Sequence, residues 1–269
     1  MAAPDASAHD VHGIDFSGAS DAGRKVWIAS GTVEDGELHV QRCRSAADLF
    51  GTTDREATHE ALVDFLRDGG PTTVGLDAPF SLPGELVDAD SWEAFVRGFD
   101  DRFDDPEEFR ETCLERTDGE NRRRDADERV GGLCPYDIRV HKQTFYAVRD
   151  VLEPLLDDVS VLPMHDTGAK RTLLEVYPTA VLEQFALFAE GYKESSDRGA
   201  RRRGRNFDGL ERCTGVEYAD RESLRETVVE NSGGDALDAI LAAYAAYDNA
   251  VTDDPLDVEY DAVEGYVYI

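Results

Sequence analysis

The chain has 269 residues, with 58 acidic and 28 basic side chains and a formal net charge of -30. Hydrophobic residues make up 41% of the chain and recur in strand-like and helix-like patterns. This excludes an intrinsically disordered acidic tail and predicts a folded body with an acidic surface. The length suits one large domain, and we expect a single α/β domain over residues 1–269.

The basic residues are almost all arginine. Lysine occurs at four positions, which are Lys25, Lys142, Lys170 and Lys193. Lysine depletion with a large acidic excess is typical of proteins from salt-accumulating halophiles, and we interpret the charge as an adaptation to the solvent. At 1 M salt the Debye length is about 3 Å, so the acidity does not exclude a nucleic acid or nucleotide as partner. It also leaves no basic surface that would indicate one.

Two further classes of protein are disfavoured by the sequence. No apolar run approaches the roughly 20 residues of a membrane helix, and residues 1–10 lack the basic and apolar segments of a signal peptide. We therefore expect a cytoplasmic protein with no membrane partner. The four cysteines form no CxxC pair, which argues against a zinc cage or a disulfide framework. The sequence leaves the oligomeric state open.

The first part of the chain is predicted to form strands and one helix. Short polar links favour antiparallel pairing of three strands, expected at 11–17, 25–33 and 37–42. A helix is predicted at about 54–68, because apolar residues recur on one face before Gly69-Gly70-Pro71 ends it. A buried strand follows at 72–77.

The pattern then changes to helices joined by polar loops. We interpret residues 78–166 as a helical insertion on the sheet, with helices at 91–99, 106–116 and 138–156. A loop rich in charge separates the last two of these helices and contains Arg122, Arg123 and Arg124.

The sheet is expected to resume at 171–176, and Pro178 begins a helix that runs to about 189. A second insertion, a basic loop, is predicted at about 190–230 and contains Arg201, Arg202, Arg203 and Arg205. A strongly apolar helix is predicted at 234–249. The last residues, 263–269, are expected to form an edge strand.

Five carboxylates lie where these elements begin or end. Asp15 interrupts the first strand, Asp77 ends the fourth and Glu175 ends the fifth, while Asp235 and Asp238 share the first turn of the last helix. Strand ends are where an α/β sheet collects its functional site. Each residue also has a structural interpretation on its own, as a turn residue for Asp15 or as a helix cap for Asp77 and Asp235.

Convergence of these carboxylates would require a counter-ion. Two carboxylates 4 Å apart repel by about 4 kcal/mol at an effective dielectric constant of 20. An all-oxygen set of ligands suits Mg²⁺ or Mn²⁺ far better than zinc. A pair of such ions roughly 3.5 to 4 Å apart can activate water and stabilise the leaving oxygen in phosphodiester hydrolysis.

The motifs around these carboxylates resemble those of the DUF429 family, a family of predicted RNase H-fold nucleases. The resemblance covers most of the chain and rests on four segments, which are GIDFSG, VGLDAPFSLP, LLEVYPTA and GDALDAILAAYAA. It implies an RNase H-like mixed sheet in the order 3-2-1-4-5. It also implies a RuvC-like acidic site whose catalytic residues are Asp15, Asp77, Glu175 and Asp238, with Asp235 beside them as a metal ligand.

Two other functions remain open at this point. An actin-like phosphotransferase or nucleotide hydrolase also carries Asp and a Gly and Ser turn after its first strand, as in Asp15-Phe16-Ser17-Gly18. The sequence has no GxxxxGK[ST] loop, however, and the D-x-x-D helix has no role in that scheme. A non-catalytic binding or regulatory module with a structural acidic site is the other alternative.

The residues that would bind a substrate are less specific. Arg139 and Gln143 lie one helical turn apart beside Tyr136, and Lys193 would add positive charge near the acidic site. We therefore predict that Arg139, Gln143 and Lys193 bind the substrate. The sequence does not distinguish DNA, RNA and a small nucleotide, or endonucleolytic from exonucleolytic cleavage. The arginine clusters at 122–124 and 201–205 would suit contacts with phosphates, and solvated loops explain them at least equally well.

Overall fold

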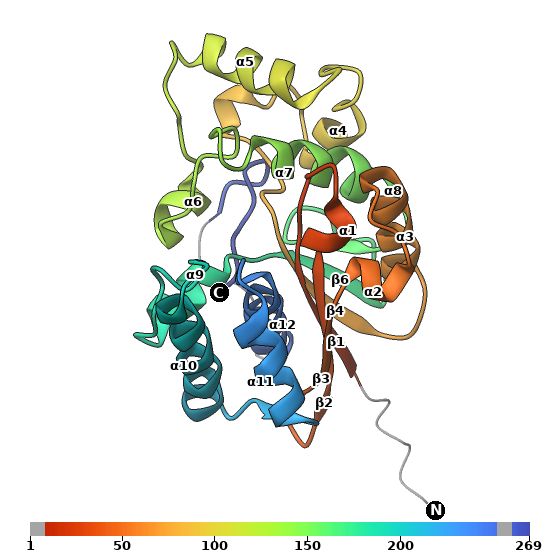
Figure 1. Ribbon diagram of the computed structural model, residues 1–269. Helices are drawn as coiled ribbons and strands as arrows, with labels where there is room; N and C mark the ends of the chain where they lie inside the picture. Colours follow the sequence, from red (N-terminus) through yellow and green to blue (C-terminus); the bar gives the residue numbers. More distant parts are fainter. Residues whose placement is uncertain (1–8, 252–259) are drawn as a thin grey trace, which may run out of the picture.

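The computed structural model describes residues 9–251 and 260–269. Its centre is a mixed sheet with helices on both faces (Figure 1), which confirms the predicted α/β class. The strands are β1 (His9–Asp15), β2 (Trp27–Glu34), β3 (Glu37–Ser45), β4 (Thr72–Asp77), β5 (Ser160–Leu162), β6 (Arg171–Glu175) and β7 (Glu217–Tyr218). They lie in the order β5-β6-β4-β1-β2-β3-β7.

The five longer strands have the predicted arrangement. β1, β2 and β3 pair in antiparallel fashion, whereas β4 is parallel to β1 and to β6. The expected order 3-2-1-4-5 is therefore present, with β6 as the fifth strand. The strands β5 and β7, which extend the sheet at its two edges, were not predicted. They have three and two residues, too few for a hydrophobic period to be visible.

The helices of the first half of the chain are α1 (Ala22–Lys25), α2 (Ala46–Phe50), α3 (Arg55–Arg67), α4 (Trp92–Arg97), α5 (Pro106–Arg116), α6 (Asp125–Val130) and α7 (His141–Tyr146), with a 3-10 turn at Gly84–Leu86. Those of the second half are the π-helix η2 (Ala147–Leu152), α8 (Glu153–Leu155), α9 (Pro178–Gln184), α10 (Asp197–Thr214), α11 (Arg221–Glu230) and α12 (Asp235–Val251). The short helices α1, α2 and α6 were not predicted.

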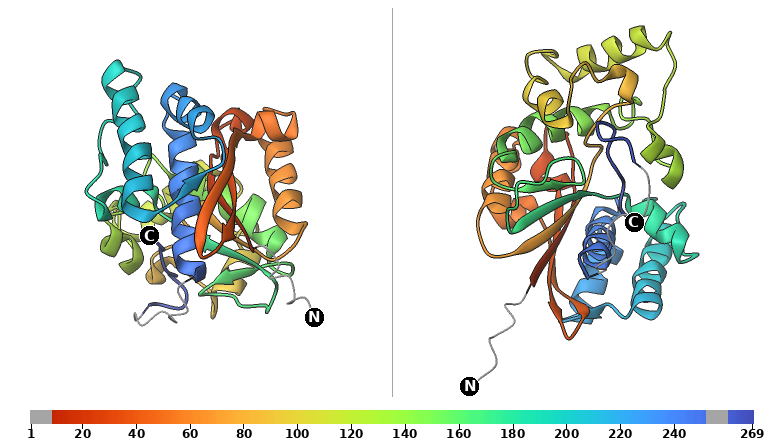
Figure 2. Two further views of the ribbon diagram at one scale, coloured as in Figure 1. Left: turned by 90° about the horizontal axis from the view of Figure 1, so that it is seen from below. Right: turned by 180° about the vertical axis from the view of Figure 1, so that it is seen from behind.

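The sheet separates two hydrophobic cores. On one face α12 packs along β1, β2 and β4. On the other face α3 and the run α7-η2-α8 cover the sheet, and Ile14 of β1 and Val74 and Leu76 of β4 belong to that core. Figure 1 shows α10, α11 and α12 on one side of the strands and α3 and α8 on the other, and Figure 2 shows the same layers from below and from behind.

Within the predicted insertion at 78–166, α4 and α5 lie beyond the ends of the strands (Figure 1), whereas α7, η2 and α8 cover a face of the sheet and β5 is one of its strands. The predicted helix at 138–156 begins at His141, because Asp137 accepts a hydrogen bond from the amide of Arg139 in a turn that precedes it. It then continues through a π-helical segment to Leu155. α3 follows the prediction closely, with Asp54 capping its first turn.

The predicted basic loop at about 190–230 is wrong, because this segment contains the helix α11 and the long helix α10, which includes residues 201–205. Ser196 caps its beginning and Gly215, at a φ of 77°, ends it in the left-handed conformation. Arg203 is only 2% exposed, and its guanidinium donates to the backbone carbonyl oxygens of Val228 and Val229. The four arginines therefore point in different directions around α10, and the buried Arg203 packs against α11.

The predicted edge strand at 263–269 is also wrong. This segment makes one isolated parallel bridge, between Val176 and Tyr268, and otherwise lies along the insertion. Glu264 accepts hydrogen bonds from the amides of Gly84 and Asp125, at 2.7 and 2.8 Å. The segment thus connects the insertion to β6. Among the described residues, no helix combines the length and the apolar composition needed to cross a membrane.

Candidate metal centre

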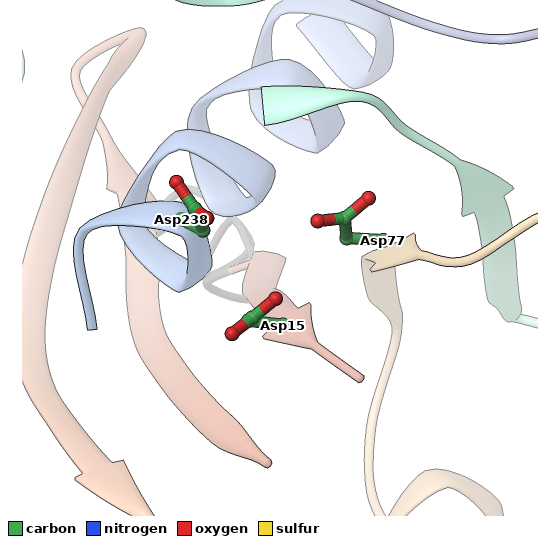
Figure 3. Close-up of side chains that lie close together, drawn as sticks. All are labelled: Asp15, Asp77 and Asp238. Carbon is green, nitrogen blue, oxygen red and sulfur yellow. The ribbon is translucent and has the colours of Figure 1, made fainter. Parts of the chain in front are cut away.

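Three aspartates meet where the first strands end and the last helix begins. Asp15 is the final residue of β1, Asp77 is the final residue of β4 and Asp238 lies in the first turn of α12. One carboxylate oxygen from each lies within 4.8 Å of the others, and Figure 3 shows the three side chains around one gap. Asp238 is fully buried, whereas the other two are partly exposed.

The register of the sheet brings the first two aspartates together. β1 and β4 are parallel neighbours, and Asp15 is paired directly with Asp77. Paired residues of adjacent strands point to the same face, so both carboxylates extend toward α12. The prediction that these two residues share one site is supported by this geometry.

Two glycines allow α12 to reach them. Gly13 and Gly75 form the pair that precedes Asp15 and Asp77 on the same face of the sheet. A Cβ atom at Gly13 would lie 2.0 Å from the backbone nitrogen of Ala243, and one at Gly75 would lie 2.4 Å from the carbonyl oxygen of Ala242. The helix therefore packs its backbone directly on the strands, which a larger residue at either position would prevent.

Burial and mutual repulsion change the protonation of the cluster. Burial raises the pKa of Asp15 well above its ordinary value, and the charges of Asp238 and Asp77 raise it further. Burial also raises the pKa of Asp77 to about 7, against the lowering influence of Lys193. A bound cation would stabilise the ionised form of both carboxylates and so oppose this rise in their pKa values.

Lys193 supplies positive charge to the cluster. Its Nζ lies 2.6 Å from Oδ2 of Asp238, an atom that makes no other contact to a donor in the described residues. The hydroxyl of Tyr192 donates to Oδ1 of Asp238 at 2.8 Å. The pKa of Lys193 is raised, and the negative charge of Asp238 is the largest cause. Lys193 was predicted to bind the substrate. In the structure it lies at the acidic site, where its ammonium contacts the carboxylate of Asp238.

Glu175 is not part of the cluster. In the parallel pairing of β4 with β6 it lies beside Leu76 and not beside Asp77, so its side chain points to the opposite face. There Arg124, fully buried, binds both of its oxygens, and the amide of Phe80 donates to Oε2 at 2.9 Å. Glu175, which was predicted to be a metal ligand, therefore lies outside the three clustered carboxylates, although it lines the same small cavity as Asp77.

The partner of Glu175 was missed in the sequence. Arg124 also binds both oxygens of Asp127, which lies one helical turn later in α6. Burial alone would lower the pKa of Arg124, but Glu175 and Asp127 raise it well above its ordinary value. The arginine cluster at 122–124, which the sequence left as a solvated loop, therefore includes a buried structural residue.

Asp235 lies at the edge of the cluster. Its pKa is raised by burial and by the charge of Asp238, and the Asn231 side chain forms a hydrogen bond with it. It is not among the three carboxylates whose oxygens lie within 4.8 Å. Asp235, which was predicted to be a metal ligand, therefore lies beside the three clustered carboxylates.

The predicted substrate residues lie in different surroundings. Gln143 donates to the backbone carbonyl oxygens of Phe16 and Asp77, and so holds the ends of β1 and β4 together. Arg139 is 65% exposed and forms an ion pair with Asp137 at 2.8 Å. The two residues therefore do not form one pocket, since Arg139 lines a separate hollow on the insertion.

Two hollows flank the cluster. A small cavity of about 60 Å³ is lined by Asp77, Gln143, Glu175 and Tyr177, among others. This volume admits about two water molecules but no nucleotide. A larger hollow of about 700 Å³ lies between β3 and α11 and contains both arginine and acidic side chains. The cavity, and not the larger hollow, is lined by one of the three clustered aspartates, Asp77.

The donor set fits one hard cation. Oxygens on adjacent octahedral positions at about 2.1 Å from Mg²⁺ lie about 3.0 Å apart, so three oxygens within 4.8 Å of one another would move closer together around one ion. All three ligands are carboxylate oxygens, which favours Mg²⁺ or Mn²⁺ over zinc. With Glu175 on the other face of the sheet, the described residues provide a carboxylate set for one ion and not for two.

A repeated signal in the sequence marks two of the three ligands. The segments Gly13-Ile14-Asp15 and Gly75-Leu76-Asp77 have the same spacing of a small residue and an aspartate. Together with an alanine-rich helix, this spacing is typical of a close helix-to-sheet contact that ends at the acidic residues. The roles of Tyr192 and Arg124 have no comparable signal.

One family model matches the chain. It is described as "Protein of unknown function (DUF429)" and covers residues 13–255, which include the three aspartates, Lys193 and most of the sheet. No curated protein matches the sequence, and no solved structure matches it either.

Proposed function

The chain belongs to the DUF429 family, and we propose that it is a metal-dependent nuclease or phosphodiesterase. The observation that supports this is the convergence of Asp15, Asp77 and Asp238 within 4.8 Å. The proposed cofactor is one Mg²⁺ or Mn²⁺ ion held by these three residues. The proposed substrate is a nucleic acid or a nucleotide, and the RNase H-like character of the sheet belongs to the same proposal.

The three aspartates and Gln143 have separate roles in this proposal. The bound ion would polarise a phosphate oxygen and lower the pKa of water. Asp15, Asp77 and Asp238 would hold the ion, and Asp77 also lines a cavity that admits water. Gln143 fixes the two strand ends through the carbonyl oxygens of Phe16 and Asp77, and this limits the movement of the ligands.

A second candidate is a non-catalytic binding or regulatory module. One observation favours it, since Lys193 already neutralises part of the charge of Asp238 at 2.6 Å. In that case the acidic group would be a structural ion pair, and the small cavity of about 60 Å³ would contain only water. The two candidates differ in whether the cluster binds a divalent cation.

The deciding experiment is a cleavage assay with labelled single-stranded DNA, single-stranded RNA and a phosphodiester nucleotide in high monovalent salt. High salt is needed because the net charge of -30 would otherwise repel the substrate. We expect cleavage with Mn²⁺ or Mg²⁺ and none with EDTA. Asp15→Asn and Asp77→Asn should each reduce the rate by at least about a hundredfold, the effect of losing one stabilising group in a transition state.

Asp101→Asn is the matched control, because Asp101 is an exposed carboxylate of the insertion. This variant should cleave at the rate of the parent protein. Full activity in both cluster variants, or activity that EDTA does not affect, would refute the nuclease proposal. Circular dichroism and melting curves would confirm that each variant is folded.

A further inference from the structure

The ion pair between Lys193 and Asp238 differs from the surface ion pairs of this protein. Nζ of Lys193 and Oδ2 of Asp238 are 2.6 Å apart, and the side chain of Asp238 is only 1% exposed. Lys193 itself is 54% exposed and comes from the segment between α9 and α10, not from the sheet. A half-exposed ammonium thus reaches inward to a carboxylate of the metal centre.

A second lysine provides a direct comparison. Lys142 and Glu107 are also 2.6 Å apart, and Lys142 is 52% exposed, almost as much as Lys193. The carboxylate is different, because Glu107 is 58% exposed. Water can replace the ammonium around Glu107, whereas the buried oxygen of Asp238 depends on the cation that faces it.

The backbone around Lys193 is fixed in this position. Arg203, 2% exposed, donates to the carbonyl oxygens of Tyr192 and Glu194 on either side, at 2.7 and 3.2 Å. Tyr192 is itself buried, and its hydroxyl donates to Asp238. The segment therefore fixes the backbone of Lys193 beside the cluster. The long side chain of Lys193 can still turn outward to solvent.

We propose that Lys193 is a tethered counter-ion that competes with the divalent cation for Asp238 and thereby sets the metal affinity of the centre. This inference rests on the proposed function, because it concerns the same cation. A divalent ion bound to Asp238 repels an ammonium at ion-pair distance from the same carboxylate. With a divalent ion bound, the half-exposed Lys193 ammonium would turn away from Asp238 toward solvent.

The first test measures the affinity of Mn²⁺ alone by calorimetry in high monovalent salt. We expect Lys193→Gln to bind Mn²⁺ at least about tenfold more tightly than the parent protein, because the competing charge is gone. Lys193→Arg keeps the charge and should stay within about threefold of the parent. Lys142→Gln, the matched control, should not change the affinity. Equal or weaker binding by Lys193→Gln would overturn the proposal.

The second test needs no variant, so it holds even where Lys193→Gln fails to fold. The chain has four lysines, and acylation with a small amine-reactive reagent can be followed at each by peptide mass spectrometry. Mn²⁺ should increase the rate of acylation at Lys193 severalfold, because the ammonium leaves its ion pair. The rate at Lys142 should not change. An equal rate at Lys193 with and without Mn²⁺ would contradict the displacement.

The outcomes separate this inference from the nuclease proposal. Tighter Mn²⁺ binding by Lys193→Gln without cleavage of any phosphodiester would support the counter-ion role and refute the nuclease. Metal-dependent cleavage with unchanged affinity in Lys193→Gln would support the nuclease and overturn the counter-ion role. If neither the parent nor Lys193→Gln binds Mn²⁺, both are overturned.

Discussion

Two groups of buried carboxylates lie on opposite faces of the sheet and are neutralised in different ways. On one face, Glu175 and Asp127 share the guanidinium of Arg124, which binds both oxygens of each. Backbone amides complete their hydrogen bonds. On the other face, Asp15 and its neighbours have one lysine for three carboxylates.

The comparison shows why burial of acidic residues does not by itself indicate a site. A carboxylate with a bidentate arginine and an amide donor has little capacity for a further cation. A group with more carboxylates than cations, at the ends of two strands, retains charge that a metal can neutralise. The first arrangement stabilises the fold, and the second provides the candidate function.

The largest expected effect concerns the arginine-bound group. Arg124→Met leaves Glu175 and Asp127 buried without their partner, so we expect the free energy of unfolding to fall by about 3 to 5 kcal/mol. Denaturant unfolding in high salt measures this loss. Arg123→Met is the control, because Arg123 is exposed, and it should change stability by less than about 0.5 kcal/mol. A loss below about 1 kcal/mol for Arg124→Met would show that Glu175 and Asp127 do not depend on the arginine, and the contrast with the acidic cluster would be lost.

The next effect concerns the contact that assembles the acidic group. The Cβ of Gly75→Ala would lie 2.4 Å from the carbonyl oxygen of Ala242, so α12 must shift, at a cost of about 1 to 3 kcal/mol. The shift also moves Asp238 away from the strand ends, and Mn²⁺ affinity should fall. Gly70→Ala has open space around its Cβ and serves as control. Unchanged stability and affinity in Gly75→Ala would contradict a glycine requirement.

The third prediction uses the pH dependence of stability in EDTA. The pKa of Asp77 is about 7 in the folded protein, above its ordinary value of 3.8. The folded state therefore binds the proton more tightly than the unfolded state. This contribution to stability is fully present below pH 3.8 and is lost as the pH rises through about 7.

Asp77→Asn does not titrate, so the difference between the parent and this variant isolates the effect. Between pH 4 and pH 8 the parent should lose about 1 to 3 kcal/mol relative to Asp77→Asn, as measured by urea unfolding at each pH. Saturating Mn²⁺ should reduce this difference. A parent that gains stability relative to the variant over the same range would show that Asp77 is a satisfied structural carboxylate.

The smallest expected effect separates the two residues that were predicted to share a pocket. Arg139→Ala removes an exposed ion pair with Asp137 and should cost less than about 1 kcal/mol, with no change in Mn²⁺ affinity. Gln143→Ala leaves two carbonyl oxygens at the strand ends without a donor and should cost about 1 to 3 kcal/mol. Equal effects of the two substitutions on stability and on Mn²⁺ affinity would support the original prediction that Arg139 and Gln143 share one pocket.

Much of the fold follows from local patterns in the sequence. The hydrophobic periods and the Gly-Pro stop at 69–71 indicate the five long strands, α3 and α12, because each of these elements buries one face over many residues. The two-residue strand β7 and the helix α10 were not predicted. In α10 the arginines hide the helical pattern, since Arg203 is buried through bonds to backbone carbonyls of α11.

The candidate site was only partly determined in this way. The sequence indicates Asp15 and Asp77, because they lie in or at the end of predicted strands, and Asp238, because it lies in the first turn of an apolar helix. Only the tertiary structure decides that Glu175 is excluded. Side chains alternate along a strand, and the pairing of Glu175 with Leu76, one residue before Asp77, turns it to the opposite face, where Arg124 binds it.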